Sequence, residues 1–164
     1  MKKVLLSVLL LVSVSLLFAQ NPIRDHTDLK NWLPDQLMGL QAEGDGYSSQ
    51  QQQGESYFIA AKKYKDSGSE VSVVIIDYRS KSKSMTDHLA QWKEGKSVET
   101  DLISASATLL GNVKAKEVFE KNKNSSQLYL YHKDRYLITL STTQDNMQLL
   151  RNVAANLQLS TLPE

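Results

Sequence analysis

The run Glu70–Tyr78, EVSVVIIDY, constrains the fold of this chain more than any other stretch. Its valines and isoleucines favour a β-strand, because β-branched side chains fit the pleated surface of a sheet. Side chains alternate along a strand, so apolar residues fall on both faces of this one. One face carries Val71, Val73 and Ile75, and the other carries Val74, Ile76 and Tyr78. We therefore expect a central strand between two covering layers.

Two segments have the pattern of β-hairpins. In the first, the run at residues 56–65 and the run at residues 70–78 flank the polar, Gly-containing turn DSGS. In the second, Leu128–Tyr131 and Tyr136–Ser141 flank the polar segment HKDR. The tyrosines in these arms also favour strands. Both patterns predict an antiparallel sheet.

A short helix is predicted near the start of the chain. Apolar residues recur at i, i+3 and i+4 over residues 29–33, and Pro34 ends the run. Asp25 or Thr27 can cap this helix. The next segment, residues 35–40, is either a further helical turn or an irregular apolar entry into the core.

Two further helices are predicted from apolar stripes. Ser84 begins the first in a pattern resembling a capping box, and Gly95 ends it. Thr142 or Thr143 caps the second. The stripes are Met85, Leu89 and Trp92 in the first helix, and Met147, Leu150, Val153 and Leu157 in the second.

The segments between these elements are less regular. Residues 44–55, GDGYSSQQQQGE, have no apolar period and predict a flexible Gln-rich loop. Residues 97–110 fit both strand and helix, and we favour a strand. Residues 113–119 alternate as a strand with one polar face. The whole order predicts an α+β fold, a single antiparallel sheet with helices packed on it.

Residues 1–19 have the three regions of a secretory signal peptide. Lys2 and Lys3 precede the apolar stretch Val4–Phe18, and Ala19 offers a small residue for cleavage. The stretch is shorter than the roughly 20 residues of a membrane span. We expect bacterial export to the periplasm or the medium, with residues 20–164 as a single domain.

Composition excludes several classes of partner and site. Removing Lys2 and Lys3 with the signal leaves 17 basic residues against 18 acidic ones, which gives no attraction to nucleic acid or anionic membranes. The chain has no cysteine, so disulfides and thiolate metal sites are excluded. His26, His88 and His132 stand alone, without a second ligand at helical spacing. We expect no metal and no cofactor.

Asp77 is the residue that contradicts its surroundings. A carboxylate within an apolar strand costs several kcal/mol unless it is paired or lies at the wet end of the strand. The structural interpretation places Asp77 at the end of the strand or in a pair with an arginine. The functional interpretation makes Asp77, Tyr78, Arg79 and His88 a polar cluster that binds a ligand.

Residues Leu128–Leu159, LYLYHKDRYLITLSTTQDNMQLLRNVAANLQL, resemble the closing half of PsbP-like domains, in which a tight hairpin leads into a final helix. The hairpin Tyr57–Tyr78 is more loosely similar to the same family. Most members are accessory or binding domains, which the resemblance implies for this chain. It carries no functional residue to a matching position, and Gln50–Gln53 departs from the family pattern.

The chain contains no GxSxG, Walker or GxGxxG motif in residues 20–164. Our first hypothesis is therefore a noncatalytic module that binds an unknown protein or small ligand through its aromatic hairpins. The alternative is an envelope hydrolase built around Asp77, His88 or His132, because acids and bases lie near predicted strand ends.

Overall fold

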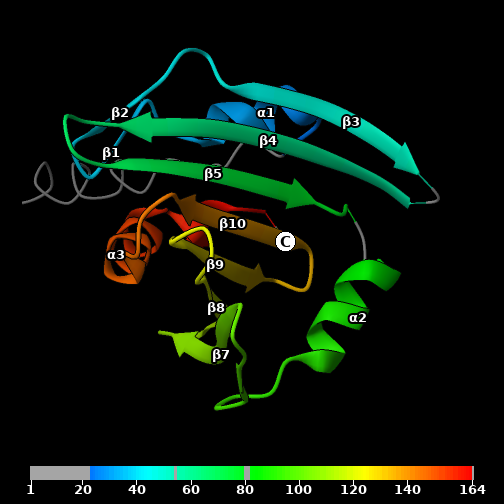
Figure 1. Cartoon of the computed structure of the whole chain (residues 1–164). Helices are drawn as coiled ribbons and strands as arrows, with labels where there is room; N and C mark the ends of the chain where they lie inside the picture. Colours follow the sequence, from blue (N-terminus) through cyan, green and yellow to red (C-terminus); the bar gives the residue numbers. More distant parts are fainter. Residues whose placement is uncertain (1–22, 54, 80–81, 164) are drawn as a thin grey trace, which may run out of the picture.

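The computed structural model describes residues 23–53, 55–79 and 82–163. The predicted signal peptide, residues 1–19, lies outside them. Within the described residues the chain forms three α-helices and ten strands in an antiparallel sheet, which confirms the predicted α+β class (Figure 1). The helices are α1 His26–Trp32, α2 Lys83–Gln91 and α3 Met147–Asn156, with a 3-10 turn, η1, at Leu159–Thr161. The strands are β1 Gln36–Leu37, β2 Leu40–Ala42, β3 Tyr47–Gln53, β4 Glu55–Lys65, β5 Glu70–Asp77, β6 Ser97–Glu99, β7 Ile103–Leu110, β8 Val113–Glu120, β9 Ser125–His132 and β10 Tyr136–Thr142.

The strands follow the order β1-β2-β4-β5-β10-β9-β8-β7-β6, and β3 pairs with β4 beside this path. The apolar run that opened the sequence analysis is β5, which lies between β4 and β10. Both of its neighbours are antiparallel to it. Strands β7, β8, β9 and β10 pair in the order of the sequence and form a meander.

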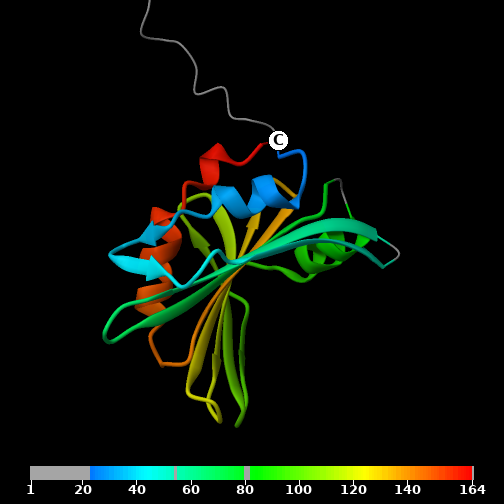
Figure 2. The same ribbon diagram turned by 90° about the horizontal axis from the view of Figure 1, so that it is seen from above.

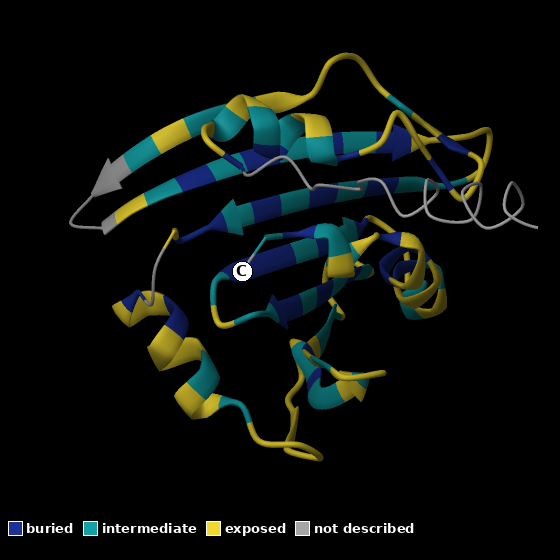
Figure 3. Ribbon diagram, turned by 180° about the vertical axis from the view of Figure 1, so that it is seen from behind, coloured by how far each residue is buried: buried dark blue, intermediate teal, exposed yellow. Residues whose placement is uncertain are grey.

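The two faces of β5 are covered unequally. Val71, Val73, Ile75 and Asp77 are buried, whereas the residues between them are half-buried (Figure 3). The predicted central position of this strand is confirmed, and of its two faces one is buried and the other half-buried. Apolar residues on both faces of a strand indicate that both faces are at least partly buried. They do not show how much of each face a helix covers.

The buried face belongs to the larger of two apolar clusters. The sheet contributes residues such as Ile75, Leu130 and Ile138, all with at most 1% exposure. The helices and the tail contribute Leu29, Leu150 and Leu162, each fully buried. The indole Nε1 of Trp32 donates a hydrogen bond to Oγ1 of Thr161 at 2.8 Å, which joins α1 to η1. The two ends of the described chain thus meet over one face.

Helix α2 lies on the other side of the sheet from α3 (Figure 2). Its Met85 belongs to the second cluster, with Tyr78, Tyr131 and Leu137. Just after the helix, Nε1 of Trp92 donates to the carbonyl of Ala115 in β8 at 2.8 Å. This bond fixes the end of α2 against the sheet.

Two stretches predicted as irregular or helical are strands. Residues 35–40 contain β1 and the first residue of β2. Met38 and Gly39 adopt positive φ angles of 55° and 86°, which form the tight turn that lets these two strands pair. The predicted loop at residues 44–55 contains β3, paired with β4 over its whole length. Main-chain hydrogen bonds pair strands without needing apolar side chains. A strand rich in glutamine therefore shows no apolar pattern by which it could be predicted. Residues 97–110 contain β6 and β7, as the favoured interpretation had it.

Two of the predicted helix caps were wrong by two to four residues. The hydroxyl of Ser82, not Ser84, accepts from the main-chain N–H of Met85 at the start of α2. The side chain of Asn146, not a threonine, caps α3. Asp25 is the cap of α1, one of the two alternatives.

Candidate functional site

Asp77 is fully buried at the end of β5 and is neutralised there by Arg135. Nε and Nη2 of Arg135 each donate to one carboxylate oxygen at 2.7 Å, and the main-chain N–H of Arg79 donates to Oδ1 at 2.7 Å. The hydrogen bonds that Arg135 donates to Asp77 raise the pKa of the guanidinium above its ordinary value. A bidentate pair with an extra donor accounts for a carboxylate inside an apolar strand.

The four residues of the predicted cluster lie on two sides of the sheet. Arg79 stays near Asp77, with its guanidinium 4.3 Å from the centre of the Phe58 ring. Tyr78 turns to the side of α2, where it packs with Met85. His88 is an exposed residue of α2 on that same side. The structure therefore groups Asp77 with Arg79, and Tyr78 with the α2 side, where His88 also lies.

The side of the sheet that faces α2 is rich in tyrosine, and we call it the tyrosine face. It carries four of the seven tyrosines of the chain, namely Tyr57, Tyr78, Tyr129 and Tyr131. The rings of Tyr57 and Tyr78 have centres 5.8 Å apart, and that of Tyr131 lies 6.2 Å from the imidazole of His88. Burial raises the pKa of both Tyr129 and Tyr131, which keeps their phenols neutral.

The strand register places lysines beside these tyrosines. Lys116 of β8 lies opposite Tyr129 of β9, and Lys114 lies opposite Tyr131. Residues two apart on a strand share a face, so all four side chains lie on the tyrosine face. The ammonium of Lys114 is 5.5 Å from the centre of the Trp92 ring. This part of the face is both aromatic and cationic.

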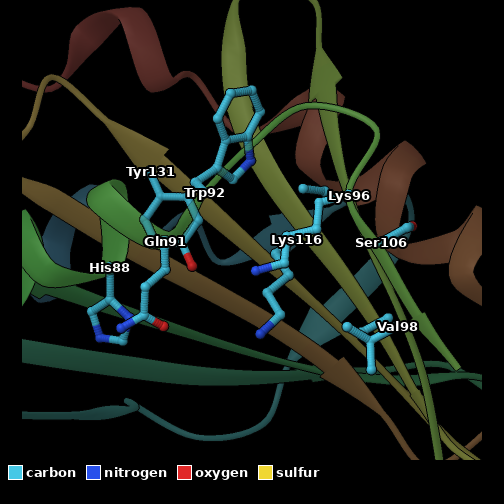
Figure 4. Close-up of a pocket in the computed structure, with 10 residues that line it drawn as sticks. His88, Gln91, Trp92, Lys96, Val98, Ser106, Lys116 and Tyr131 are labelled. Carbon is cyan, nitrogen blue, oxygen red and sulfur yellow. The ribbon is translucent and has the colours of Figure 1, made fainter. Parts of the chain in front are cut away.

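A pocket of about 130 Å³ opens between α2 and strands β6 to β9 (Figure 4). Its floor includes Ala105 and Ala107 of β7, which share the face of Lys116 and whose small side chains leave space that larger residues would fill. Its walls are His88, Gln91, Trp92, Lys96, Val98, Lys116 and Tyr131. This combination of small floor and aromatic wall makes the pocket our candidate binding site.

The three histidines have different surroundings. Nδ1 of His26 lies 3.0 Å from the hydroxyl of Ser48, so α1 and β3 bring a base next to a hydroxyl. His88 faces Tyr131, and the ring of His132 lies 6.4 Å from that of Tyr136. In the described ranges, no three His, Asp or Glu residues are grouped so as to hold a metal ion.

Of the four residues in the predicted cluster, only His88 lines this pocket, which no local sequence pattern indicated. The paired alternations Lys114, Lys116 and Tyr129, Tyr131 were a usable signal, since period-2 residues share a face. The cluster of small residues at 104–107 was a second signal. Neither one indicates that α2 returns to cover the same strands.

In comparisons with known proteins, no protein-family model, no curated protein and no solved structure matches the chain. Of the helices within the described ranges, none has the length and apolar character that crossing a bilayer requires.

Proposed function

We propose that this protein is an exported, noncatalytic binding module that holds its ligand or partner on the tyrosine face. The observation that carries the proposal is the unequal covering of the sheet. Helices α1 and α3 and η1 lie over one face, whereas α2 leaves the opposite face half-buried and hollowed beside Tyr131 and Trp92.

Aromatic side chains suit such a surface. Tyrosine and tryptophan offer large rigid contact areas at low entropic cost and are enriched where proteins recognise partners. A concave site with a few polar groups among apolar walls is also the usual form of a ligand pocket. The resemblance of residues 128–159 to PsbP-like domains, many of them accessory or binding domains, agrees with a binding role.

The test fills the pocket and asks whether binding is lost. Ala107 is half-buried on the pocket floor, and the variant Ala107→Leu puts an isobutyl group into the cavity. Ala90→Leu is the matched control, since Ala90 is exposed on α2 and does not line the pocket. The three proteins are incubated with an extract of the bacterial envelope, washed, denatured and analysed by mass spectrometry.

We expect the unsubstituted protein and Ala90→Leu to retain the same compound or protein, and Ala107→Leu to retain at least tenfold less of it. Equal retention by Ala107→Leu, or no specific retention by any of the three, would contradict the proposal. Circular dichroism establishes that each variant is folded before the comparison.

A second candidate function, an envelope hydrolase, is favoured by the contact between Ser48 and His26. A hydroxyl and an imidazole 3.0 Å apart are within the reach of a nucleophile and its base. The described residues place no carboxylate in a hydrogen bond with His26 to orient its ring, as a complete triad would. Hydrolysis of p-nitrophenyl acetate that disappears in Ser48→Ala and persists in Ser49→Ala would support this candidate; no activity above buffer would eliminate it.

A further inference from the structure

Two lysines of the pocket have no acidic partner among the residues that the structure describes. The ammonium groups of Lys96 and Lys116 make no ion pair or hydrogen bond with any described residue. By contrast, six other lysines pair with carboxylates, namely Lys62, Lys63, Lys65, Lys83, Lys121 and Lys123. No Asp or Glu lines the pocket. Two uncompensated positive charges beside one hollow attract an anion.

Three other wall residues of the pocket, Trp92, Tyr131 and Val98, present apolar surfaces. Trp92 uses its indole N–H on the carbonyl of Ala115, so its ring is what it offers to a ligand. Tyr131 is 9% exposed and presents its ring beside His88. Val98 is 44% exposed, although it is apolar and lines the same hollow. Planar groups stack on such surfaces.

The size of the pocket limits the ligand to one ring. About 130 Å³ is well below the roughly 300–1,000 Å³ of sites that hold drug-sized molecules. Gln91 also lines the pocket, and its side chain makes no hydrogen bond with the described residues. It supplies an amide for a polar substituent on that ring.

We propose that the pocket binds a small aromatic anion, with its anionic group held by Lys96 and Lys116 and its ring against Tyr131 and Trp92. This inference rests on the proposed function and adds the chemical class of the ligand. The shared chemistry is a carboxylate, sulfonate or phosphate on a single planar ring.

The two tryptophans provide a site-specific readout. The chain has only Trp32 and Trp92, so a ¹H–¹⁵N spectrum shows two indole N–H signals. Trp92 lines the pocket, whereas Trp32 donates to Thr161 on the other side of the sheet. The protein is titrated with sodium benzoate, with neutral benzamide and with sodium acetate. Benzoate is expected to shift the Trp92 signal saturably and at lower concentration than the other two, while the Trp32 signal stays in place.

Lysine variants then test the charge. Lys116→Gln and Lys96→Gln should each weaken benzoate binding about tenfold, the size of one charge-assisted hydrogen bond, and leave benzamide binding unchanged. Lys30→Gln is the control, because Lys30 lies in α1 outside the pocket. This variant should bind benzoate as tightly as the unsubstituted protein does.

The possible failures are distinguishable. Equal shifts with benzoate and benzamide, or equal affinity for benzoate in Lys116→Gln and Lys30→Gln, would contradict an anionic ligand. Neither result would contradict ligand binding in the pocket. A Trp92 signal that no probe moves would overturn the aromatic anion altogether. In that case the retention experiment with Ala107→Leu still decides the proposed function, since it presumes no ligand class.

Discussion

At the scale of single residues, the pair Asp77–Arg135 shows how a charged group is accommodated inside an apolar strand. The carboxylate has no exposure, and the guanidinium side chain is 15% exposed. Each carboxylate oxygen has an N–H donor from Arg135, and Oδ1 has a second one from the main chain. The pair therefore joins the turn after β5 to the start of β10, and we expect its role to be structural.

The variant Asp77→Asn tests this role. It removes the countercharge that Asp77 supplies to the guanidinium of Arg135, so we expect the free energy of unfolding to fall by about 3–5 kcal/mol in urea denaturation. Lys83→Gln breaks the exposed pair between Lys83 and Asp87 and should change stability by less than about 1 kcal/mol. A loss in Asp77→Asn no larger than in Lys83→Gln would contradict a structural pair.

Tyr64 links stability to alkaline pH. It is fully buried, its hydroxyl donates to the carbonyl of Pro34 at 2.9 Å, and burial together with the charge of Asp35 raises its pKa. The folded state thus holds the phenol proton more tightly than the unfolded chain, whose tyrosine pKa is about 10. The stability that Tyr64 contributes is complete below that pH and is lost as the pH rises towards the folded pKa.

We therefore expect Tyr64→Phe to be less stable than the unsubstituted protein by about 1 kcal/mol at pH 8, from the lost hydrogen bond. The advantage of the unsubstituted protein should fall by about 1.4 kcal/mol for each pH unit above 10, so that Tyr64→Phe becomes the more stable protein near pH 11. Urea denaturation from pH 8 to pH 11 measures it. Tyr47→Phe, at an exposed position, is the control; a Tyr64→Phe difference that stays constant with pH would refute the linkage.

At the scale of elements, the start of α2 determines how the helix meets the tyrosine face. Ser82 is buried, and its hydroxyl accepts from Met85, the residue that packs into the second cluster. Ser84 lies inside the helix and is exposed. The residue whose N–H is capped by Ser82 is thus the same residue that packs the helix against the sheet.

Replacing each serine by alanine separates the predicted cap from the observed one. Ser82→Ala should lower the free energy of unfolding by about 1 kcal/mol, because it leaves a main-chain N–H without its acceptor. Ser84→Ala should be neutral or slightly stabilising, since alanine is the better helix former. Thermal unfolding distinguishes the two; a larger loss in Ser84→Ala would return the cap to the predicted position.

The elements with a strong periodic pattern were predictable, and those held by main-chain pairing were not. β5, β9 and β10 follow from β-branched and aromatic runs, and α3 follows from its apolar stripe. β3 escaped prediction because YSSQQQQ contains no apolar period, and its strand form depends on the register with β4. Caps escaped because several hydroxyl or amide side chains near each helix start are chemically able to serve.

At the scale of the whole molecule, the site depends on contacts that no local pattern contains. The antiparallel register brings Lys116 opposite Tyr129, and the chain between β5 and β6 places α2 over the same strands. The sequence alone pointed to Asp77 and His88 as partners, because the connection after β5 is short. A strand's alternation sends Asp77 and Tyr78 to opposite faces, which is why the predicted cluster divides in two.

The most direct test of the tyrosine face as the binding surface follows the two indole signals while an extract of the bacterial envelope is added to ¹⁵N-labelled protein. We expect the Trp92 signal to shift, the Trp32 signal to stay in place, and Ala107→Leu to abolish the shift. A shift of Trp32 alone, or an unchanged spectrum at saturating extract, would contradict this expectation.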